Sequence, residues 1–240
     1  LKRLFGGNPP PREKRGIFNH DHRKLILVDG RVGFIGGMNV ANEYEHVWHD
    51  VVARVEGPAV HAMHLSVLDR WKAAGGKVPA DLAAMPRPTF DPPAGDLPVE
   101  YLVTIPGVST PILDWYLRSI EGARQRILIE MAYFLDDRII QGLCRAAGRK
   151  VRTVVIIPSD EKNDVYLVKE AFAWVQNDVV RAGIELYKYQ PALTHAKVAT
   201  FDGKTSTIGS SNLDRLALDE ISEANIVVPD PRFARVMEQK

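Results

Sequence analysis

The chain has 240 residues, of which 45% are apolar, and this is enough to bury the core of one large domain or of two small ones. Basic and acidic residues nearly balance, at 31 and 30, so the overall charge does not identify a class of partner. The single cysteine excludes an intrachain disulfide, and without a run of 18 apolar residues no segment of this sequence is predicted to span a bilayer.

Positive charge is concentrated at the start of the chain. Residues 1–31 contain eight basic residues and three acidic ones. Such a segment favours an anionic partner, but it suits a membrane surface and a nucleic-acid backbone equally well. A solvated, flexible arm is a third interpretation, so charge alone leaves the partner open.

The first part of the chain predicts a basic loop followed by a short sheet. Glycine and proline interrupt any helix in residues 1–21. Apolar runs on either side of an Asp-Gly pair predict a hairpin over about 22–36, and a polar loop follows at 42–50. Residues 51–55 predict a strand, and helical spacing of apolar residues predicts a helix from Pro58 to about Ala74.

A proline-rich segment separates this region from a second one with clear alternation. Residues 75–98 hold six of the sixteen prolines and predict a linker. Beyond it we expect strands near 99–104, 126–134, 151–158 and 184–189, and helices near 111–125, 137–147 and 163–182. Thr110 is the expected cap of the first of these helices. Strands that alternate with helices predict a parallel or mixed sheet covered on its faces.

A segment that begins at His22 occurs a second time at His195, with a constant offset of 173 residues. The matched positions are His22 and His195, Lys24 and Lys197, Asp29 and Asp202, Gly36 and Gly209, and Asn39 and Asn212, with acidic Asp50 matching acidic Glu223. At average residue usage one identity has a chance of roughly one in fifteen, so this set of identities is not accidental. The chain therefore contains two copies of one site.

The local structure expected for each copy brings its polar residues together. Side chains at i and i+2 share a face of a strand, so His22 lies beside Lys24, and the second copy repeats this arrangement. The Asp-Gly pair of each copy predicts a two-residue hairpin turn. Asp29 and Asp202 are therefore either turn residues or members of the site. The glycine that ends each hairpin predicts a close approach of the backbone to a ligand.

Two histidines, two lysines and two asparagines without a cysteine partner indicate phosphate chemistry rather than a metal site. A neutral imidazole can attack an anionic phosphodiester, and ammonium groups can stabilise charge that develops on its oxygens. One imidazole would form a phosphohistidine, while the other would protonate the leaving alcohol and then deprotonate water or an acceptor alcohol. This double displacement requires no metal and no other cofactor. The remaining histidines carry no catalytic zinc signature.

The motif H-x-K-x4-D followed by G-G-x-N or G-S-x-N, present twice, resembles the phospholipase D superfamily. The flanking segments 19–24, 34–39, 48–50, 55–60 and 211–214 are similar to bacterial cardiolipin synthases. The resemblance implies an α/β fold of two pseudo-symmetric phospholipase D-like lobes, with mixed sheets flanked by helices. The expected boundaries are 1–74 for the first lobe, 75–98 for the linker and 99–240 for the second lobe.

The resemblance also implies roles for individual residues. The candidate catalytic residues are His22, Lys24, Asp29, His195, Lys197 and Asp202. The candidate substrate-binding residues are Asn39, Asn212, Gly36, Gly209, Ser210, Asp50 and Glu223. By position, His22 would be the nucleophile and His195 the general acid and base, with Asp50 and Glu223 each orienting a histidine. The spacing of the two motifs does not itself distinguish the two imidazoles.

The two lobes differ in length and in detail. Only 21 residues precede His22, whereas 96 residues of the second lobe precede His195, so the first lobe is expected to be incomplete by about 75 residues. Any membrane-anchoring segment is expected outside this chain. The family often has Thr-Pro-Tyr-Phe where this chain has 130–134, and serine and asparagine where it has Ala217 and Ile221. These differences concern the substrate more than the chemistry.

The leading functional hypothesis is a phosphatidyltransferase that resembles cardiolipin synthase and joins a phosphatidyl group to phosphatidylglycerol. Its expected partners are an anionic phospholipid and a membrane surface, on the cytoplasmic side of a bacterial cytoplasmic membrane, with nucleic acid disfavoured. A phosphodiesterase that uses water as the acceptor, on a phospholipid or a nucleic acid, is the first alternative. A non-catalytic lipid-binding scaffold is the second.

Overall fold

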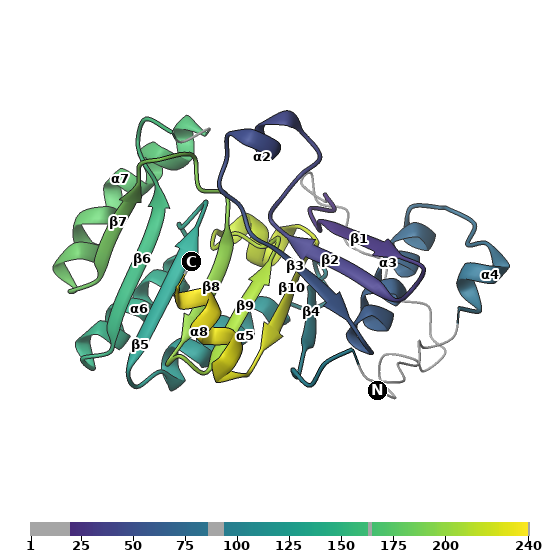
Figure 1. Ribbon diagram of the computed structural model, residues 1–240. Helices are drawn as coiled ribbons and strands as arrows, with labels where there is room; N and C mark the ends of the chain where they lie inside the picture. The colour runs from purple at the N-terminus through teal and green to yellow at the C-terminus, as the bar shows by residue number, and fades with distance from the viewer. Residues whose placement is uncertain (1–19, 86–93, 163–164, 240) are drawn as a thin grey trace.

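The computed structural model describes residues 20–85, 94–162 and 165–239. These residues form two β-sheets flanked by helices (Figure 1). One sheet has three strands in the order β1-β2-β3, and the other has seven in the order β4-β10-β9-β8-β5-β6-β7. We call each sheet with its helices a lobe, in chain order. The predicted α/β architecture of two lobes is confirmed.

The first lobe is an antiparallel meander with helices in its connections. Its elements are β1 (Leu25–Val28), β2 (Val32–Gly36), α2 (Asn42–His46), β3 (Val52–Glu56), α3 (Ala59–Ala73) and α4 (Ala80–Ala83). Helix α3 contacts all three strands. The hairpin, the third strand and the long helix therefore confirm the sequence-based prediction. The short helices α2 and α4 lie in segments that were expected to be a loop and a linker.

The second lobe contains a mixed sheet. Its strands are β4 (Glu100–Thr104), β5 (Arg126–Met131), β6 (Arg152–Pro158), β7 (Glu185–Tyr189), β8 (Lys197–Phe201), β9 (Thr205–Gly209) and β10 (Glu223–Val228). Its helices are α5 (Pro111–Gly122), α6 (Asp137–Gly148), α7 (Tyr166–Arg181), the π-helix η1 (Leu216–Glu220) and α8 (Pro231–Glu238). Strands β5, β6 and β7 are parallel, whereas β8, β9, β10 and β4 add to the sheet in antiparallel fashion. The alternation of strands and helices correctly predicted a mixed sheet, whereas β10, η1 and α8 were not predicted.

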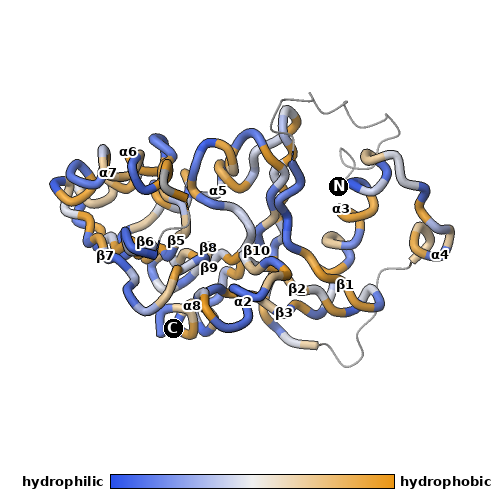
Figure 2. Tube along the Cα trace, turned by 90° about the horizontal axis from the view of Figure 1, so that it is seen from above, coloured by the Kyte–Doolittle hydropathy of each residue, from blue (hydrophilic) through white to orange (hydrophobic). Residues whose placement is uncertain are grey.

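Helices cover the larger sheet on both faces. Helices α5, α6 and α7 lie on one face, and α8 lies on the other (Figures 1 and 2). The core beneath the first three helices includes Tyr116, Ile127, Leu143 and Val155, which are all fully buried. Burial of a side chain of this size contributes on the order of 2 kcal/mol. This packing makes the second lobe a firm support for the residues at the ends of its strands.

A second core cluster joins the two lobes. The first lobe contributes Ile35, Val55 and Met63, and the second contributes Ile208 and Ile226, among other residues. Ile35 and Ile208 occupy the same position of the sequence repeat, since they differ by 173. The repeat therefore places matching apolar residues on the two faces that pack together. Shared burial of these side chains holds the lobes in one arrangement.

Both predicted hairpin turns form as the Asp-Gly pairs require. Asp29 and Gly30 have φ of 52° and 64°, and Asp202 and Gly203 have φ of 55° and 61°. Positive φ at both central residues is the geometry of the tight turn that matches the twist of paired strands. Aspartate tolerates this conformation better than most residues, and glycine adopts it without steric cost.

The structure corrects some element boundaries. Strand β5 ends at Met131 rather than at Phe134. The Ala132 N–H still donates to the Ala196 carbonyl, in line with the pairing of β5 and β8, whereas Phe134 pairs with Leu213 of another segment. Thr110 stands at the start of α5, but its side chain makes no capping hydrogen bond. The helix instead begins with a proline, whose fixed φ suits the first helical position.

Candidate active site

The two motif histidines are each paired with a carboxylate from the other lobe. Nδ1 of His22 lies 2.6 Å from Glu223 Oε1, and Nδ1 of His195 lies 2.8 Å from Asp50 Oδ2. The Glu223 side chain is fully buried and that of Asp50 is nearly so. A carboxylate at Nδ1 holds the proton there and leaves Nε2 of a neutral ring as the basic nitrogen. The arrangement therefore presents two oriented imidazoles.

Backbone hydrogen bonds repeat the same crossed pattern. The bonds are His22 N–H to the Ser222 carbonyl (2.9 Å), His195 N–H to the His49 carbonyl (2.6 Å), Ser222 N–H to the His20 carbonyl (3.0 Å) and His49 N–H to the Leu193 carbonyl (2.8 Å). Every residue in the first and third bonds matches one in the second and fourth at the offset of 173. The lobes thus exchange equivalent bonds about a local pseudo-twofold axis, as in an isologous interface.

The two half-sites share one electrostatic environment. Burial lowers the pKa of Lys24 to about 8, while Glu223 and Asp50, one from each half-site, act to raise it. Its ammonium group donates to the His22 carbonyl at 2.8 Å, and that of Lys197 donates to the His195 carbonyl at 2.7 Å. Lys197 is fully buried. The geometry therefore brings two imidazoles and two ammonium groups to one place between the lobes.

Burial also shifts the acid–base behaviour of the second half-site and its partners. Burial lowers the pKa of His195, Lys197 and Lys24 lower it further, and the hydrogen bond with Asp50 opposes the shift. Burial raises the pKa of Glu223, which His22, Ser210 and Lys24 counteract. An anion bound between the lysines would favour the charged form of the His195 imidazole.

Two aromatic residues cover the second histidine. The rings of Tyr44 and Trp48 lie 5.2 Å and 5.6 Å from that of His195, measured between centroids. The His195 side chain is 6% exposed, whereas that of His22 is 32% exposed. Neither aromatic residue belongs to the repeated motif, so the motif did not identify them as part of the site. Their position between the motif asparagine and Asp50 is the signal that could have indicated them.

Ser210 holds a carboxylate in the structure. Its hydroxyl donates to Oε2 of Glu223, whose other oxygen contacts His22. The matching position of the first half-site is Gly37, where a Cβ atom would lie 2.5 Å from Asp50 Oδ1 and 2.8 Å from the His195 carbonyl oxygen. Each half-site therefore packs its carboxylate against the residue at this position.

Gly36 and Gly209 lie where a larger side chain would clash with a neighbouring strand. This packing, and not the predicted close approach to a ligand, explains why both residues are glycine. A Cβ atom at Gly36 would lie 2.8 Å from the Cα atom of Val52 on the adjacent strand. A Cβ atom at Gly209 would overlap the side-chain oxygen of Asn225. Neighbouring strands, rather than a ligand, impose these two residues.

Asp29 and Asp202 lie away from the histidines, which corrects their expected place in the catalytic group. Both occupy hairpin turns, and about 20 Å of extended chain separates each from its motif histidine. Asp202 accepts hydrogen bonds from the backbone N–H groups of residues 124–126. Against the effect of burial, these groups hold the pKa of Asp202 below its usual range. The structure therefore supports the alternative interpretation as turn residues.

The two motif asparagines have different surroundings. Asn39 is exposed, and its amide donates to the Tyr44 hydroxyl at 2.8 Å. Asn212 is 5% exposed, and its buried Oδ1 has no hydrogen-bond partner among the described residues. Asn212 therefore retains an acceptor that a substrate hydroxyl could use.

Within the described ranges, three or more histidine, cysteine, aspartate or glutamate side chains nowhere converge as a metal site would require. None of the helices in these ranges is both long and apolar enough to cross a lipid bilayer.

Comparisons with known proteins agree with this geometry. A family model described as "Cardiolipin synthase, PLD-like domain" matches residues 116–240, which is more than half of the chain. The chain is 30% identical to the probable cardiolipin synthase YwiE of Bacillus subtilis strain 168 and 33% identical to cardiolipin synthase A of Pseudomonas entomophila strain L48. Each match covers 94% of this chain, but 47% and 49% of those proteins. The chain therefore spans about half the length of the curated relatives it matches.

A solved structure supports the fold. The crystal structure of phosphatidylserine synthase from Haemophilus influenzae Rd KW20 superposes with a TM-score of 0.71, covering 95% of this chain and 62% of that one. Sequence identity is 14%, so this similarity concerns the fold alone.

Proposed function

Because the chain belongs to the phospholipase D-like family of the cardiolipin synthases, we propose that it carries both half-sites of a phosphatidyltransferase. The observation that supports this most directly is the crossed pairing of His22 with Glu223 and of His195 with Asp50. This pairing orients two imidazoles within one region that also contains two ammonium groups. The proposed substrate of the enzyme is an anionic phospholipid, with phosphatidylglycerol as both the donor and the acceptor of the phosphatidyl group.

In the first step, Nε2 of His22 attacks the phosphorus of the donor. A P–N bond forms, the P–O bond to the leaving glycerol breaks, and protonated His195 gives its proton to the departing oxygen. In the second step, His195 removes a proton from the acceptor hydroxyl, which attacks phosphorus and breaks the P–N bond. Lys24 and Lys197 stabilise the charge on the non-bridging oxygens.

His195 needs its proton before the first step, although burial lowers its pKa. The anionic phosphate of the substrate raises the pKa of a nearby imidazole, so binding of the lipid prepares the acid. We assign attack to His22 from its place in the first motif. Enzyme labelled by phosphatidylglycerol carrying ³²P and denatured at alkaline pH, where the P–N bond survives, should yield a labelled peptide that contains His22. A label on His195 would reverse the two roles.

Transfer rather than hydrolysis requires that water be kept from the phosphohistidine. Tyr44 and Trp48 cover His195, the base that would otherwise activate water. This cover supports a lipid alcohol as the acceptor. The phosphodiesterase reaction, on a lipid or a nucleic acid, uses the same residues and is the alternative product outcome. We place the reaction at a membrane surface, on the cytoplasmic side of a bacterial cytoplasmic membrane, because the proposed lipid substrates are amphiphiles of that membrane.

One assay separates the candidate functions. Full-length protein incubated with labelled phosphatidylglycerol should form cardiolipin and glycerol. Phosphatidic acid as the main product would indicate a hydrolase, and absence of both products would indicate a non-catalytic lipid-binding scaffold. Activity should persist in the presence of a chelator, because the proposed steps use only side chains of the chain.

A further inference from the structure

Glu130 lies beside the second half-site and contacts both lobes. It is near the end of β5, and its side chain is 16% exposed. The Thr194 hydroxyl donates to Glu130 Oε1, and Nε2 of His49 lies 3.3 Å from the same oxygen. Thr194 belongs to the second lobe and His49 to the first. Oε1 of Glu130 therefore contacts one residue from each lobe.

The two residues that Glu130 contacts immediately precede His195 and Asp50 in the sequence. Thr194 precedes His195, and His49 precedes Asp50. Their backbones form a parallel bridge, within which the His195 N–H donates to the His49 carbonyl at 2.6 Å. A displacement of either backbone would move the imidazole relative to its carboxylate, so the position of this bridge sets the geometry of the His195–Asp50 pair.

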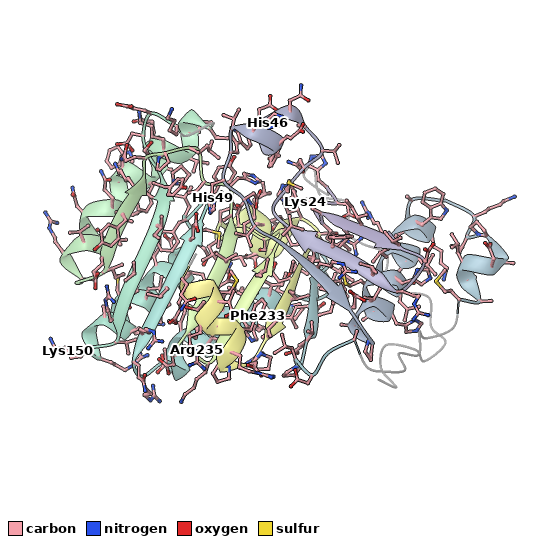
Figure 3. The ribbon with its side chains drawn as sticks, viewed as in Figure 1. Lys24, His46, His49, Lys150, Phe233 and Arg235 are labelled. Atoms are coloured by element: carbon pink, nitrogen blue, oxygen red, sulfur yellow. The ribbon has the colours of Figure 1, made fainter. Side chains whose placement is uncertain are left out.

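Other second-lobe groups hold His49 in the same position. Its ring lies 5.2 Å from that of Tyr189, centroid to centroid, at an interplanar angle of 31°. Tyr189 ends β7, and Glu130 lies near the end of β5, so both are on strands of one rigid sheet. Figure 3 shows His49 and Lys24 at a similar height in the upper half of the view, below His46. The first-lobe imidazole is thus seated on the second lobe.

The first half-site anchors its equivalent bridge differently. Asp21 stands where the second half-site has Thr194, and it pairs with Arg23 at 2.6 Å and with Arg70 at 3.2 Å. All three residues belong to the first lobe. Glu130, by contrast, contacts a residue of each lobe. The difference indicates that the second half-site depends on Glu130 for its alignment.

We propose that Glu130 is a positioning residue that aligns His195 with Asp50 by accepting a hydrogen bond from Thr194 and by contacting the His49 imidazole with the same oxygen. This inference rests on the proposed function only for its kinetic readout. Both contacts are made to one oxygen, Oε1, so an amide oxygen can replace it. Glutamine at this position should therefore preserve the alignment, and alanine should not.

The test compares Glu130→Ala and Glu130→Gln in the full-length protein. Loss of a group that orients a catalytic residue costs about 10- to 100-fold, so kcat of Glu130→Ala should fall by this factor with little change in KM. Glu130→Gln should stay within about 3-fold of wild type, because it keeps the acceptor. Glu185→Ala is the matched control, since it removes a β7 carboxylate that pairs with exposed Arg152.

A second readout does not depend on the lipid reaction. Imidazole ¹⁵N shifts report the tautomer of His195, which Asp50 holds with its proton on Nδ1. Glu130→Ala should give a mixture of tautomers at His195, whereas Glu130→Gln and Glu185→Ala should not. If wild-type protein makes no cardiolipin, the proposed function fails while this measurement still decides the inference. An unchanged tautomer in Glu130→Ala, or an equal defect in Glu130→Gln, would overturn it.

Discussion

The two half-sites perform matching tasks with different residues. In the second, Ser210 bonds to Glu223; in the first, Gly37 leaves room for the shorter Asp50. Glutamate has one more methylene group than aspartate, and the serine hydroxyl holds its second oxygen. The first half-site instead holds Asp50 with the Val51 N–H at 2.7 Å. The repeat therefore preserves a carboxylate next to each imidazole while its packing changes.

The cover over each histidine differs as well. Tyr44 and Trp48 of the first lobe lie over His195, and the residues that match them at the offset of 173 are Ala217 and Ile221. Smaller side chains at these positions agree with the greater exposure of His22. The comparison shows that one imidazole is shielded and the other is accessible.

Removal of either imidazole should have the largest effect. We expect His22→Ala and His195→Ala each to lower kcat by about 10³-fold or more, and the double variant to be little worse, because the two act as a unit. Initial rates of cardiolipin formation measure this effect. If either single variant kept a tenth of wild-type activity, the half-sites would not be interdependent.

Exchange of the packing pair should have the next largest effect. Gly37→Ser would force a Cβ atom against Asp50 Oδ1, so activity should fall by about 10- to 100-fold. Adding Asp50→Glu copies the Ser210–Glu223 pair and should restore part of this loss. A double-mutant cycle on kcat measures the coupling. Strictly additive losses would contradict the matched packing.

The lysine of the first half-site should determine the alkaline limit of activity. Lys24 has a pKa of about 8, so its charge is present below that pH and is lost as the pH rises through it. We expect kcat/KM to fall about tenfold per unit above pH 8, because this ratio reports the free enzyme. Lys24→Arg should move the limit upward, since arginine stays charged. An identical limit in that variant would assign the titration to another group.

Opening the aromatic cover should change the product more than the rate. Trp48→Ile copies Ile221 of the other half-site and should expose His195 to water. Because burial lowers the pKa of His195, exposure should raise it, so His195 should keep the proton that it needs in the first step up to a higher pH. The ratio of phosphatidic acid to cardiolipin should rise by about 3-fold. A constant product ratio would show that Trp48 does not exclude water.

Loss of a turn carboxylate should affect stability and leave the chemistry intact. Asp202→Ala removes an acceptor for three backbone N–H groups and should cost about 1–3 kcal/mol of unfolding free energy. Asp202→Asn retains an acceptor and tolerates positive φ, so it should cost less. The lowered pKa of Asp202 adds stability above its unfolded pKa, and this part is lost as the pH falls through the folded value. Thermal unfolding measures both variants, and a large loss of kcat in folded protein would return Asp202 to the site.

Short-range sequence patterns predicted most of the helices and strands, and they predicted the histidine and lysine of each half-site. Apolar periodicity located the strands and long helices, and the Asp-Gly pairs located both hairpins. Each His-x-Lys pair followed from the alternation of a strand. The prediction that Gly36 and Gly209 approach a ligand was wrong. In a sequence, a glycine that makes room for a ligand cannot be distinguished from a glycine that makes room for a neighbouring strand. The atoms that require glycine there belong to residues brought close only by strand pairing.

The sequence by itself determined that two equivalent sets of imidazole, ammonium and carboxylate groups exist, because the repeat is visible as identities at a constant offset. Only the tertiary structure decided that each carboxylate serves the histidine of the opposite lobe. The physical reason is that the apolar faces of the lobes pack together, which brings each motif histidine against the start of the other lobe's last strand. Residues 173 apart in the chain thereby become parts of one site.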